Sequence, residues 1–184
     1  MPDLEADLFN LAMSEQAQPL MDAVQNHIDE NIAPITEEFH SLEKEKEDRW
    51  SWHPRQLELL EGAKDKAKAS GLWNFFLPGY SEVGEGLTNL DYAYIATELG
   101  KWALASESLN CSAPDTGNME VLERVGTPEQ QEKWLQPLLN GEIRSAYAMT
   151  EPGLPSSDAK NISTSAVLDG DEWVINGEKF YISG

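Results

Sequence analysis

The spacing of apolar residues changes near Gly141, and this change constrains the fold more than any other feature of the 184-residue sequence. Before Gly141, apolar residues recur at steps of three and four, which is the period of an amphipathic helix. After Gly141 the period falls toward two, which is typical of strands. The sequence therefore predicts an α+β chain, with a helical domain over residues 1–141 and a strand-rich part over residues 142–184.

Five or six helices are expected in the first part. Apolar residues over 20–42 predict one long helix, or two joined at Pro34, because proline lacks the N–H that a helix interior needs. A further helix is expected from Pro54 to a stop at Gly71. Its inward-facing residues are predicted to be Leu57, Leu60 and Ala67.

Local start and stop signals place the later helices. Thr88 followed by Asp91 predicts one helix start, and another helix is expected over 116–125. The run Thr-Pro-Glu-Gln at 127–130 forms a capping box with proline at the first helical position. Asn140-Gly141 is expected to end that helix.

The second part predicts an antiparallel meander. The strands are expected at 145–149, 162–168, 172–175 and 178–182, with tight turns at Asp169-Gly170 and Asn176-Gly177. So few strands would keep an open edge and could not close a barrel. The sequence therefore looks like the first part of a larger fold.

The charge excludes several classes of partner. With 13 basic and 33 acidic residues the net charge is −20, which would repel nucleic acid and anionic membranes. The 40% hydrophobic content is too high for a disordered acidic tail. A lone cysteine, Cys111, suits a buried position in a reducing compartment. Without a 20-residue apolar run or a signal peptide pattern, we expect a cytoplasmic protein.

The sequence gives little support for a metal site or for a catalytic nucleophile. The three histidines lie 13 residues apart and are expected to be solvated or capping residues: His27, His40 and His53. The acidic run Asp169, Asp171 and Glu172 is interpreted as a hairpin turn, because the twelve-residue cation loop is not there. No metal site is therefore expected.

The segment 146–159 is the strongest candidate for a site. It ends a strand at Thr-Glu-Pro and continues into a loop rich in glycine, proline and hydroxyl side chains. Such a loop can aim N–H groups and hydroxyls at a ligand. A hydroxyl-capped connection between strands explains the same residues, so both interpretations stay open.

Three blocks in this region resemble the signature of the acyl-CoA dehydrogenase family: Tyr-Ala-Met-Thr-Glu-Pro at 147–152, Ser-Asp at 157–158, and Trp-Val-Ile-Asn-Gly-Glu-Lys-Phe-Tyr-Ile-Ser-Gly at 173–184. Residues 109–120 further resemble a subgroup in which some eukaryotic members carry a fused kinase-like domain. The resemblance spans essentially the whole chain. It implies the family's helical N-terminal domain and the beginning of its middle β-barrel, with the C-terminal four-helix domain outside this sequence.

The resemblance implies FAD-dependent α,β-dehydrogenation of an acyl-CoA thioester, with electrons passing to an electron-transferring flavoprotein. The residues implied to contact the flavin are Tyr147, Ala148, Met149, Thr150, Tyr181, Ile182 and Ser183. Thr150 would act through its hydroxyl, and Ser183 would approach flavin N5. Tyr181 stands where the family commonly has tryptophan. Ser157 would touch the CoA arm, or Ser156 instead, because the loop is one residue longer than the family's Gly-Ala-Gly-Ser.

The family's base carboxylate belongs to its C-terminal domain, so no catalytic residue is expected in this chain. We therefore expect this chain to be the N-terminal portion of such an enzyme. On its own it should bind FAD weakly and should be inactive without the C-terminal half. Implied partners are acyl-CoA, the flavoprotein acceptor, and further copies or a split-subunit partner. The alternative is a non-catalytic module that binds acyl-CoA or other proteins.

Overall fold

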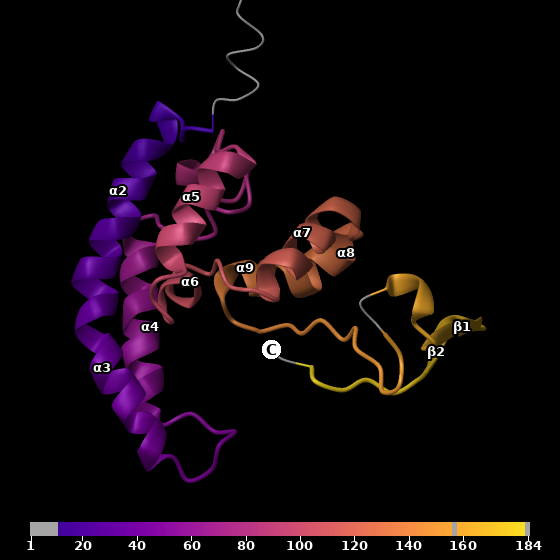
Figure 1. Ribbon diagram of the computed structural model, residues 1–184. Helices are drawn as coiled ribbons and strands as arrows, with labels where there is room; N and C mark the ends of the chain where they lie inside the picture. The colour runs from indigo at the N-terminus through magenta and orange to yellow at the C-terminus, as the bar shows by residue number, and fades with distance from the viewer. Residues whose placement is uncertain (1–10, 156–157, 183–184) are drawn as a thin grey trace, which may run out of the picture. The chain divides into compact units, whose positions relative to one another are not determined.

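The computed structural model describes residues 11–155 and 158–182 (Figure 1). Two compact units divide the chain, the first ending at Ser112 and the second beginning at Ala113. The described residues of the first unit form helices and loops, whereas the second combines helices with a β-hairpin.

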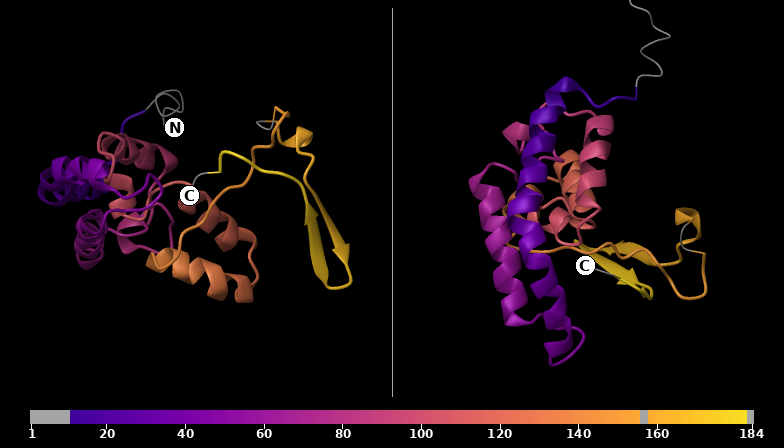
Figure 2. Two further views of the ribbon diagram at one scale, coloured as in Figure 1. Left: turned by 90° about the horizontal axis from the view of Figure 1, so that it is seen from below. Right: turned by 60° about the vertical axis from the view of Figure 1, so that its left-hand side comes forward.

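Two helices in line, α2 and α3, and three further helices make up most of the described part of the first unit. Its α-helices are α2 (Gln18–His27), α3 (Ala33–Ser41), α4 (Pro54–Ala69), α5 (Asn89–Leu99) and α6 (Ala105–Ser108). In Figures 1 and 2, α2 and α3 continue one another and lie beside α4. Apolar side chains of these three helices pack with residues of α5, α6 and the connecting loops to form the core of this unit.

The joint between α2 and α3 is the one that the sequence predicts at Pro34. A π-helical turn, Ile28–Ile32, connects the two helices. At its end the N–H of Ala33 donates to the carbonyl of Ile28, five residues back. Pro34 has no N–H to donate, so a regular α-helical ladder cannot pass through this point.

The inward face of α4 differs from the prediction at one position. Leu60 and Ala67 are buried as predicted, but Leu57 is 44% exposed, so that part of the prediction is wrong. Gln56 takes the inward place, and its amide donates to the carbonyl of Phe39 at 2.9 Å. A satisfied polar side chain thus occupies a position that spacing alone gave to a leucine.

The start of α5 is fixed by the predicted capping pair. Thr88 accepts a hydrogen bond from the N–H of Asp91, and the Asp91 carboxylate accepts one from the N–H of Thr88. The same carboxylate accepts from the N–H of Ser14 at 2.7 Å, just before α2. This last hydrogen bond is the main cause that lowers the pKa of Asp91 to about 2. One buried carboxylate therefore joins two helix starts.

The second unit begins with a helical part that confirms the predicted signals. Its elements are α7 (Asp115–Val125), α8 (Pro128–Gln130), a π-helical turn (Gln131–Leu135) and α9 (Gln136–Asn140). Thr127 and Gln130 form the capping box. Gly141 ends α9 at φ 72°, in the left-handed region that glycine favours.

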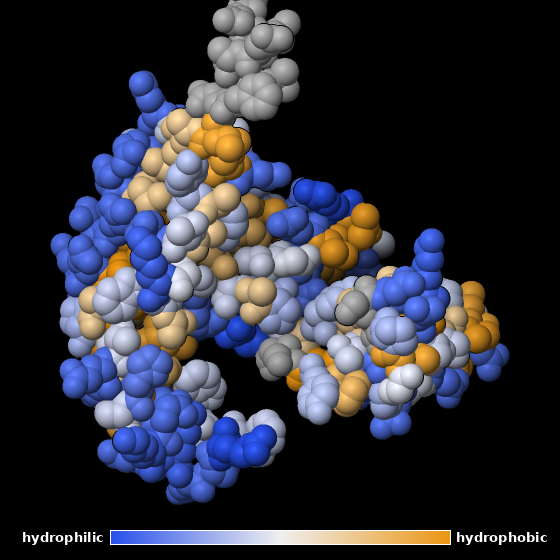
Figure 3. All heavy atoms as spheres, in the orientation of Figure 1, coloured by the Kyte–Doolittle hydropathy of each residue, from blue (hydrophilic) through white to orange (hydrophobic). Residues whose placement is uncertain are grey.

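The hairpin of the second unit pairs β1 (Ser165–Asp169) with β2 (Glu172–Asn176). The pairing is antiparallel, with Asp169 opposite Glu172, so Gly170 and Asp171 form the tight turn, one residue later than the predicted pair Asp169-Gly170. Most of its apolar side chains are exposed, as the orange patch over the hairpin in Figure 3 shows. They are Val167, Leu168, Trp173, Val174 and Ile175.

Two of the four predicted strands are wrong, because residues 145–149 and 178–182 are extended or bent without a ladder. The second predicted turn is wrong as well, since β2 ends at Asn176 without a further hairpin. Gly177 has another role: a Cβ there would lie 2.2 Å from the Thr164 hydroxyl oxygen. Close packing against Thr164, rather than a turn, requires glycine at this position.

The α+β fold class is confirmed as a helical part followed by a small antiparallel sheet. The compact units meet between Ser112 and Ala113, so α7 to α9 belong with the hairpin in the second unit. The predicted division into domains at residue 141 stays a prediction. Within the described part of the chain, no helix has the length and apolar character that crossing a membrane requires.

The histidines differ in their surroundings. His53 caps α4 by accepting from the N–H of Arg55, as predicted for a capping residue. His27 is buried instead. The Ser108 hydroxyl donates to the carbonyl of Ala105 at 2.8 Å, so its oxygen accepts from His27 Nε2 at 3.1 Å. Asn31 Nδ2 lies 3.3 Å from His27 Nδ1, and because an amide nitrogen can only donate, Nδ1 accepts and the ring is neutral.

Burial, with help from nearby Lys66, lowers the pKa of His27, while Glu30 acts in the opposite direction. Because the folded-state pKa lies below the unfolded value of about 6.5, His27 contributes stability that is present above this pH and is lost as the pH falls. We expect His27→Gln to reduce the loss of melting temperature between pH 7 and pH 5 by roughly 2–4 °C. Thermal unfolding followed by circular dichroism at the two pH values measures this change in melting temperature. His40→Gln, at an exposed position on α3, is the control, and equal pH slopes for the two variants would contradict the assignment.

Candidate functional site

The structure brings the two flavin-motif blocks of the sequence together in the second unit. The N–H of Phe180 donates to the carbonyl of Thr150 at 3.1 Å. The Lys179 ammonium group donates to the carbonyl of Met149 at 2.9 Å. Residues 147–151 and 179–182 therefore run close to one another, although no ladder forms between them.

Glu151 is the hub of this arrangement. Its side chain is only 2% exposed, and one carboxylate oxygen accepts from the N–H and the hydroxyl of Ser163 at 2.8 and 2.7 Å. The other oxygen accepts from the N–H and hydroxyl of Thr164 and from Lys179 Nζ at 2.9 Å. One carboxylate thus binds the end of the motif, the start of the hairpin and the second block.

These donors hold the pKa of Glu151 well below its usual value near 4.5, with the Thr164 hydroxyl as the largest cause and the Ser163 N–H next. Lys179 adds to the effect. A carboxylate so strongly stabilised in its charged form is a poor proton acceptor. Glu151 is therefore a structural anion in this site.

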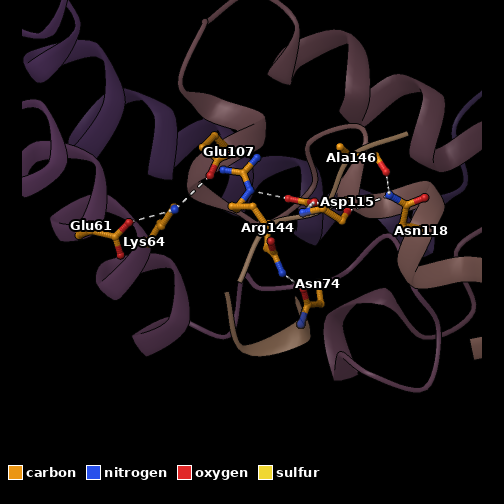
Figure 4. A network of polar contacts seen from close by, with 10 residues as sticks. Glu61, Lys64, Asn74, Glu107, Asp115, Asn118, Arg144 and Ala146 are labelled. Atoms are coloured by element: carbon orange, nitrogen blue, oxygen red, sulfur yellow. Dashed lines mark hydrogen bonds and ion pairs between the residues drawn. The ribbon is translucent and has the colours of Figure 1, made fainter. Parts of the chain in front are cut away.

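A second buried carboxylate holds the beginning of the same segment. Asp115, 3% exposed at the start of α7, accepts from Arg144 Nε at 2.6 Å and from the N–H of Ser145 at 2.8 Å. The Ser145 hydroxyl donates to the same carboxylate at 2.6 Å. Asn118, one turn along α7, donates to the Ser145 hydroxyl oxygen and, at 3.4 Å, to the Ala146 carbonyl (Figure 4).

The segment between the two carboxylates, residues 146–150, uses its carbonyls but not its N–H groups in hydrogen bonds to other described residues. Its carbonyls at 146, 149 and 150 accept hydrogen bonds from Asn118, Lys179 and Phe180. Within the described part of the chain, no N–H from 146 to 150 donates to another residue. The carbonyls are thus held while the N–H groups stay available, and available main-chain donors of this kind can bind a ligand.

The predicted aromatic residues of the site are exposed. Tyr147 is 63% exposed and Tyr181 is 85% exposed. Tyr181 has φ 54°, a left-handed conformation that is uncommon for a residue with a Cβ, and its ring lies 4.4 Å from that of Phe180 between centroids. Ala148 is exposed, Met149 and Thr150 are half-buried, and Ile182 is 37% exposed.

Three predicted residues, Ser156, Ser157 and Ser183, lie outside the described residues. Next to the first two, Asp158 accepts from the N–H of Lys160 at 3.0 Å and starts a 3₁₀ turn, Ala159–Asn161. Their assignment to the CoA arm and to the flavin stays a prediction.

The sequence predicts the residues that face the ligand, but it does not predict the residues that hold those segments in place. Lys179, Ser163 and Thr164 lie in predicted strands, and Asp115 directly precedes the predicted helix 116–125. A lysine in a strand-like run near a buried glutamate could have suggested the ion pair. Nothing local marks Asp115, because its partner Arg144 is 29 residues away in the sequence.

Two of the hollows lined by described residues bear on function. In the first unit, a polar cavity of about 440 Å³ is lined in part by Asn26, His27, Glu30 and Lys66. In the second unit, a mostly apolar groove of about 330 Å³ lies against α7 and α9, with Val121, Leu122, Trp134 and Ile143 in its wall. Burial raises the pKa of Cys111 to about 12, so its thiol is inert at neutral pH.

Comparison with known proteins decides the family. The family model for the N-terminal domain of acyl-CoA dehydrogenase matches residues 14–142. The chain belongs to the acyl-CoA dehydrogenase family. This confirms the resemblance carried by the three sequence blocks.

Individual acyl-CoA dehydrogenases give the extent of the match. Acyl-CoA dehydrogenase family member 10 of mouse is 46% identical over 176 residues, covering 94% of this chain and 16% of the mouse protein. A Mycobacterium abscessus structure assigned to the family has a TM-score of 0.84 at 44% identity, covering 94% of this chain and 43% of that one. An acyl-CoA dehydrogenase of Bacillus anthracis, solved with FAD, has a TM-score of 0.61 at 26% identity over 94% and 27%. The chain spans less than half of each relative.

The Glu151 cluster can be tested by removing its charge. In Glu151→Gln the side chain keeps its shape but presents an N–H₂ group to donors, so the hydrogen bonds from Ser163, Thr164 and Lys179 cannot all form. We expect the Phe180 amide to exchange with solvent about tenfold faster, because its bond to Thr150 depends on this cluster. Hydrogen exchange followed by NMR or mass spectrometry measures the rate.

Glu178→Gln changes the same charge at an exposed neighbouring position and serves as the control. Because the pKa of Glu151 is lowered, its contribution to stability is present above the usual carboxyl pKa and is lost only as the pH falls through the lower folded-state value. The Phe180 amide of the unmodified chain should therefore stay protected at pH 4. Equal exchange in both variants would show that Glu151 does not hold the segments together.

Proposed function

We propose that this chain forms the first part of an FAD-dependent acyl-CoA dehydrogenase, which oxidises an acyl-CoA thioester between its α and β carbons. The observation that carries the proposal is the run of open N–H donors over 146–150, fixed at both ends by buried carboxylates. The family membership and the FAD complex of the Bacillus anthracis relative support it.

The donor set fits a flavin. An isoalloxazine edge offers carbonyl oxygens and ring nitrogens that accept hydrogen bonds, and the N–H groups of Ala148 and Met149 are open donors. The Thr150 hydroxyl makes no hydrogen bond to another described residue. Tyr147 and Tyr181 add exposed aromatic faces suited to packing against a planar ring.

When bound, the flavin would accept the β hydrogen as hydride. The part of this chain would be to orient the ring and to stabilise negative charge on it through donors that do not move. One edge of the ring would be contacted by Tyr147, Ala148, Met149 and Thr150. A second part of the ring would be contacted by Tyr181, Ile182 and Ser183. Ser156 or Ser157 would hold the CoA arm of the substrate.

The proton acceptor is not assigned to this chain. Among the described residues the buried carboxylates are Asp91, Asp115 and Glu151. Asp91 and Glu151 have lowered pKa values and full sets of donors, and Asp115 is already held by Arg144 and Ser145. We therefore propose that the base comes from the part of the fold that this chain does not span, and that the chain alone does not turn over acyl-CoA.

Partners follow from the same proposal. The electrons would pass to an electron-transferring flavoprotein, and further copies of the chain or the remaining part of the enzyme would complete the site. A reducing, cytoplasmic setting suits the buried thiol of Cys111.

A second candidate is a non-catalytic acyl-CoA-binding module, which the apolar groove against α7 and α9 favours. Its lining is mostly apolar and includes the polar residues Asn118, Arg144 and Ser145. Such a module would bind acyl-CoA without FAD, whereas the dehydrogenase proposal requires FAD binding at residues 147–150.

Flavin binding separates the two candidates. We expect the chain to bind FAD measurably in a titration but to lose most of it on desalting, because part of the donor set lies outside the chain. Thr150→Val should weaken FAD binding about tenfold by removing one hydrogen bond to the ring. Flavin absorbance and fluorescence anisotropy measure both.

Thr97→Val removes an exposed hydroxyl on α5 and is the control. Acyl-CoA binding that is equally tight with and without FAD, together with no FAD binding, would favour the non-catalytic module.

A further inference from the structure

The beginning of the proposed flavin segment depends on a residue outside the three signature blocks, in the stretch 109–120. Asp115 lies on α7, and its carboxylate accepts three hydrogen bonds from Arg144 and Ser145, the two residues before the segment 146–150. Figure 4 shows Asp115 and Arg144 turned toward one another, with Asn118 turned toward Ala146. These contacts all lie within the second unit.

Burial and the use of both carboxylate oxygens make the Asp115 contact specific. The Asp115 side chain is 3% exposed, so a donor lost from it is not replaced by bulk water. Its two oxygens are used separately, one by Arg144 Nε and the other by the N–H and hydroxyl of Ser145. Arg144 is therefore positioned in direction as well as distance, and the backbone of Ser145 is fixed along with it.

The position of Ser145 determines which way the following N–H groups point. In an extended chain successive N–H groups alternate in direction, so a shift of one residue turns every donor to the other side. Lys179 and Phe180 hold only the far end of the segment, at Met149 and Thr150. Near its beginning the hydrogen bonds come from α7, through Asp115 and Asn118.

We propose that Asp115 is a positioning residue for the flavin: it fixes Ser145 and thereby the direction of the N–H donors at 146–148. This inference rests on the proposed function for the identity of the ligand. The fixed backbone itself is independent of that function, so the two can be tested separately.

The first experiment uses the full chain without FAD. Backbone ¹⁵N order parameters report motion on the picosecond to nanosecond scale. Although their N–H groups donate to no other described residue, residues 146–150 should be rigid in the unmodified chain, with order parameters of roughly 0.85. In Asp115→Asn they should fall below about 0.6 at 146–148, because the amide group cannot accept from both Ser145 and Arg144 as the carboxylate does. Residues 149 and 150 should stay rigid.

Two further variants keep the test decisive. Ser145→Ala removes only the hydroxyl donor and should give a smaller fall at the same residues, even if Asp115→Asn is poorly folded. Asp171→Asn makes the same chemical change in the exposed hairpin turn and should leave 146–148 rigid. Unchanged order parameters in both Asp115→Asn and Ser145→Ala would overturn the proposal.

The second experiment titrates FAD into the same proteins. Asp115→Asn should weaken FAD binding about tenfold, while its melting temperature is compared with that of Asp171→Asn. Weaker binding together with mobile residues at 146–148 supports the positioning role. Mobile residues with unchanged FAD affinity overturn it, because the donors would then not need Asp115. If the unmodified chain binds no FAD while the order parameters fall, the proposed function fails and the role of Asp115 in fixing the segment stands.

Discussion

The ion pair between Glu151 and Lys179 is the interaction on which the second unit depends after α9. A buried charge costs more to desolvate than an ion pair alone returns, unless further hydrogen bonds satisfy it. Here Ser163 and Thr164 supply those hydrogen bonds from both backbone and side chain. The same four residues join three segments that form no common sheet. A polar cluster therefore takes the place of a ladder, and the N–H groups of 146–150 donate to no other described residue.

The helical part was largely predictable because its boundaries are set by local chemistry. Thr88 and Thr127 cap helices through residues three positions away, and Gly141 supplies its own positive φ. Short-range signals of this kind can be recognised in any sequence. Leu57 shows the limit: its spacing predicts an inward position, whereas Gln56 is buried there and donates a hydrogen bond to the Phe39 carbonyl. Periodicity identifies a face but does not decide which of two neighbouring residues lies at its centre.

The strand-rich part was less predictable for a physical reason. Alternating residues predict an extended backbone, but a strand also needs a partner with matching hydrogen bonds. Residues 145–149 are extended because Asp115 and Asn118 hold one end and Lys179 the other, not because a neighbouring strand pairs with them. The family signature gave the ligand-facing positions. It could not give Asp115, whose role arises only when α7 packs beside the segment.

The central claim is that residues 147–150 present their N–H groups to a flavin. Chemical-shift mapping of the ¹⁵N-labelled chain during an FAD titration tests it most directly. The account predicts that the largest amide shifts occur at Tyr147 to Thr150 and at Tyr181 and Ile182. Shifts that gather instead around the polar cavity of Asn26 and Lys66, or an unchanged spectrum at millimolar FAD, would contradict it.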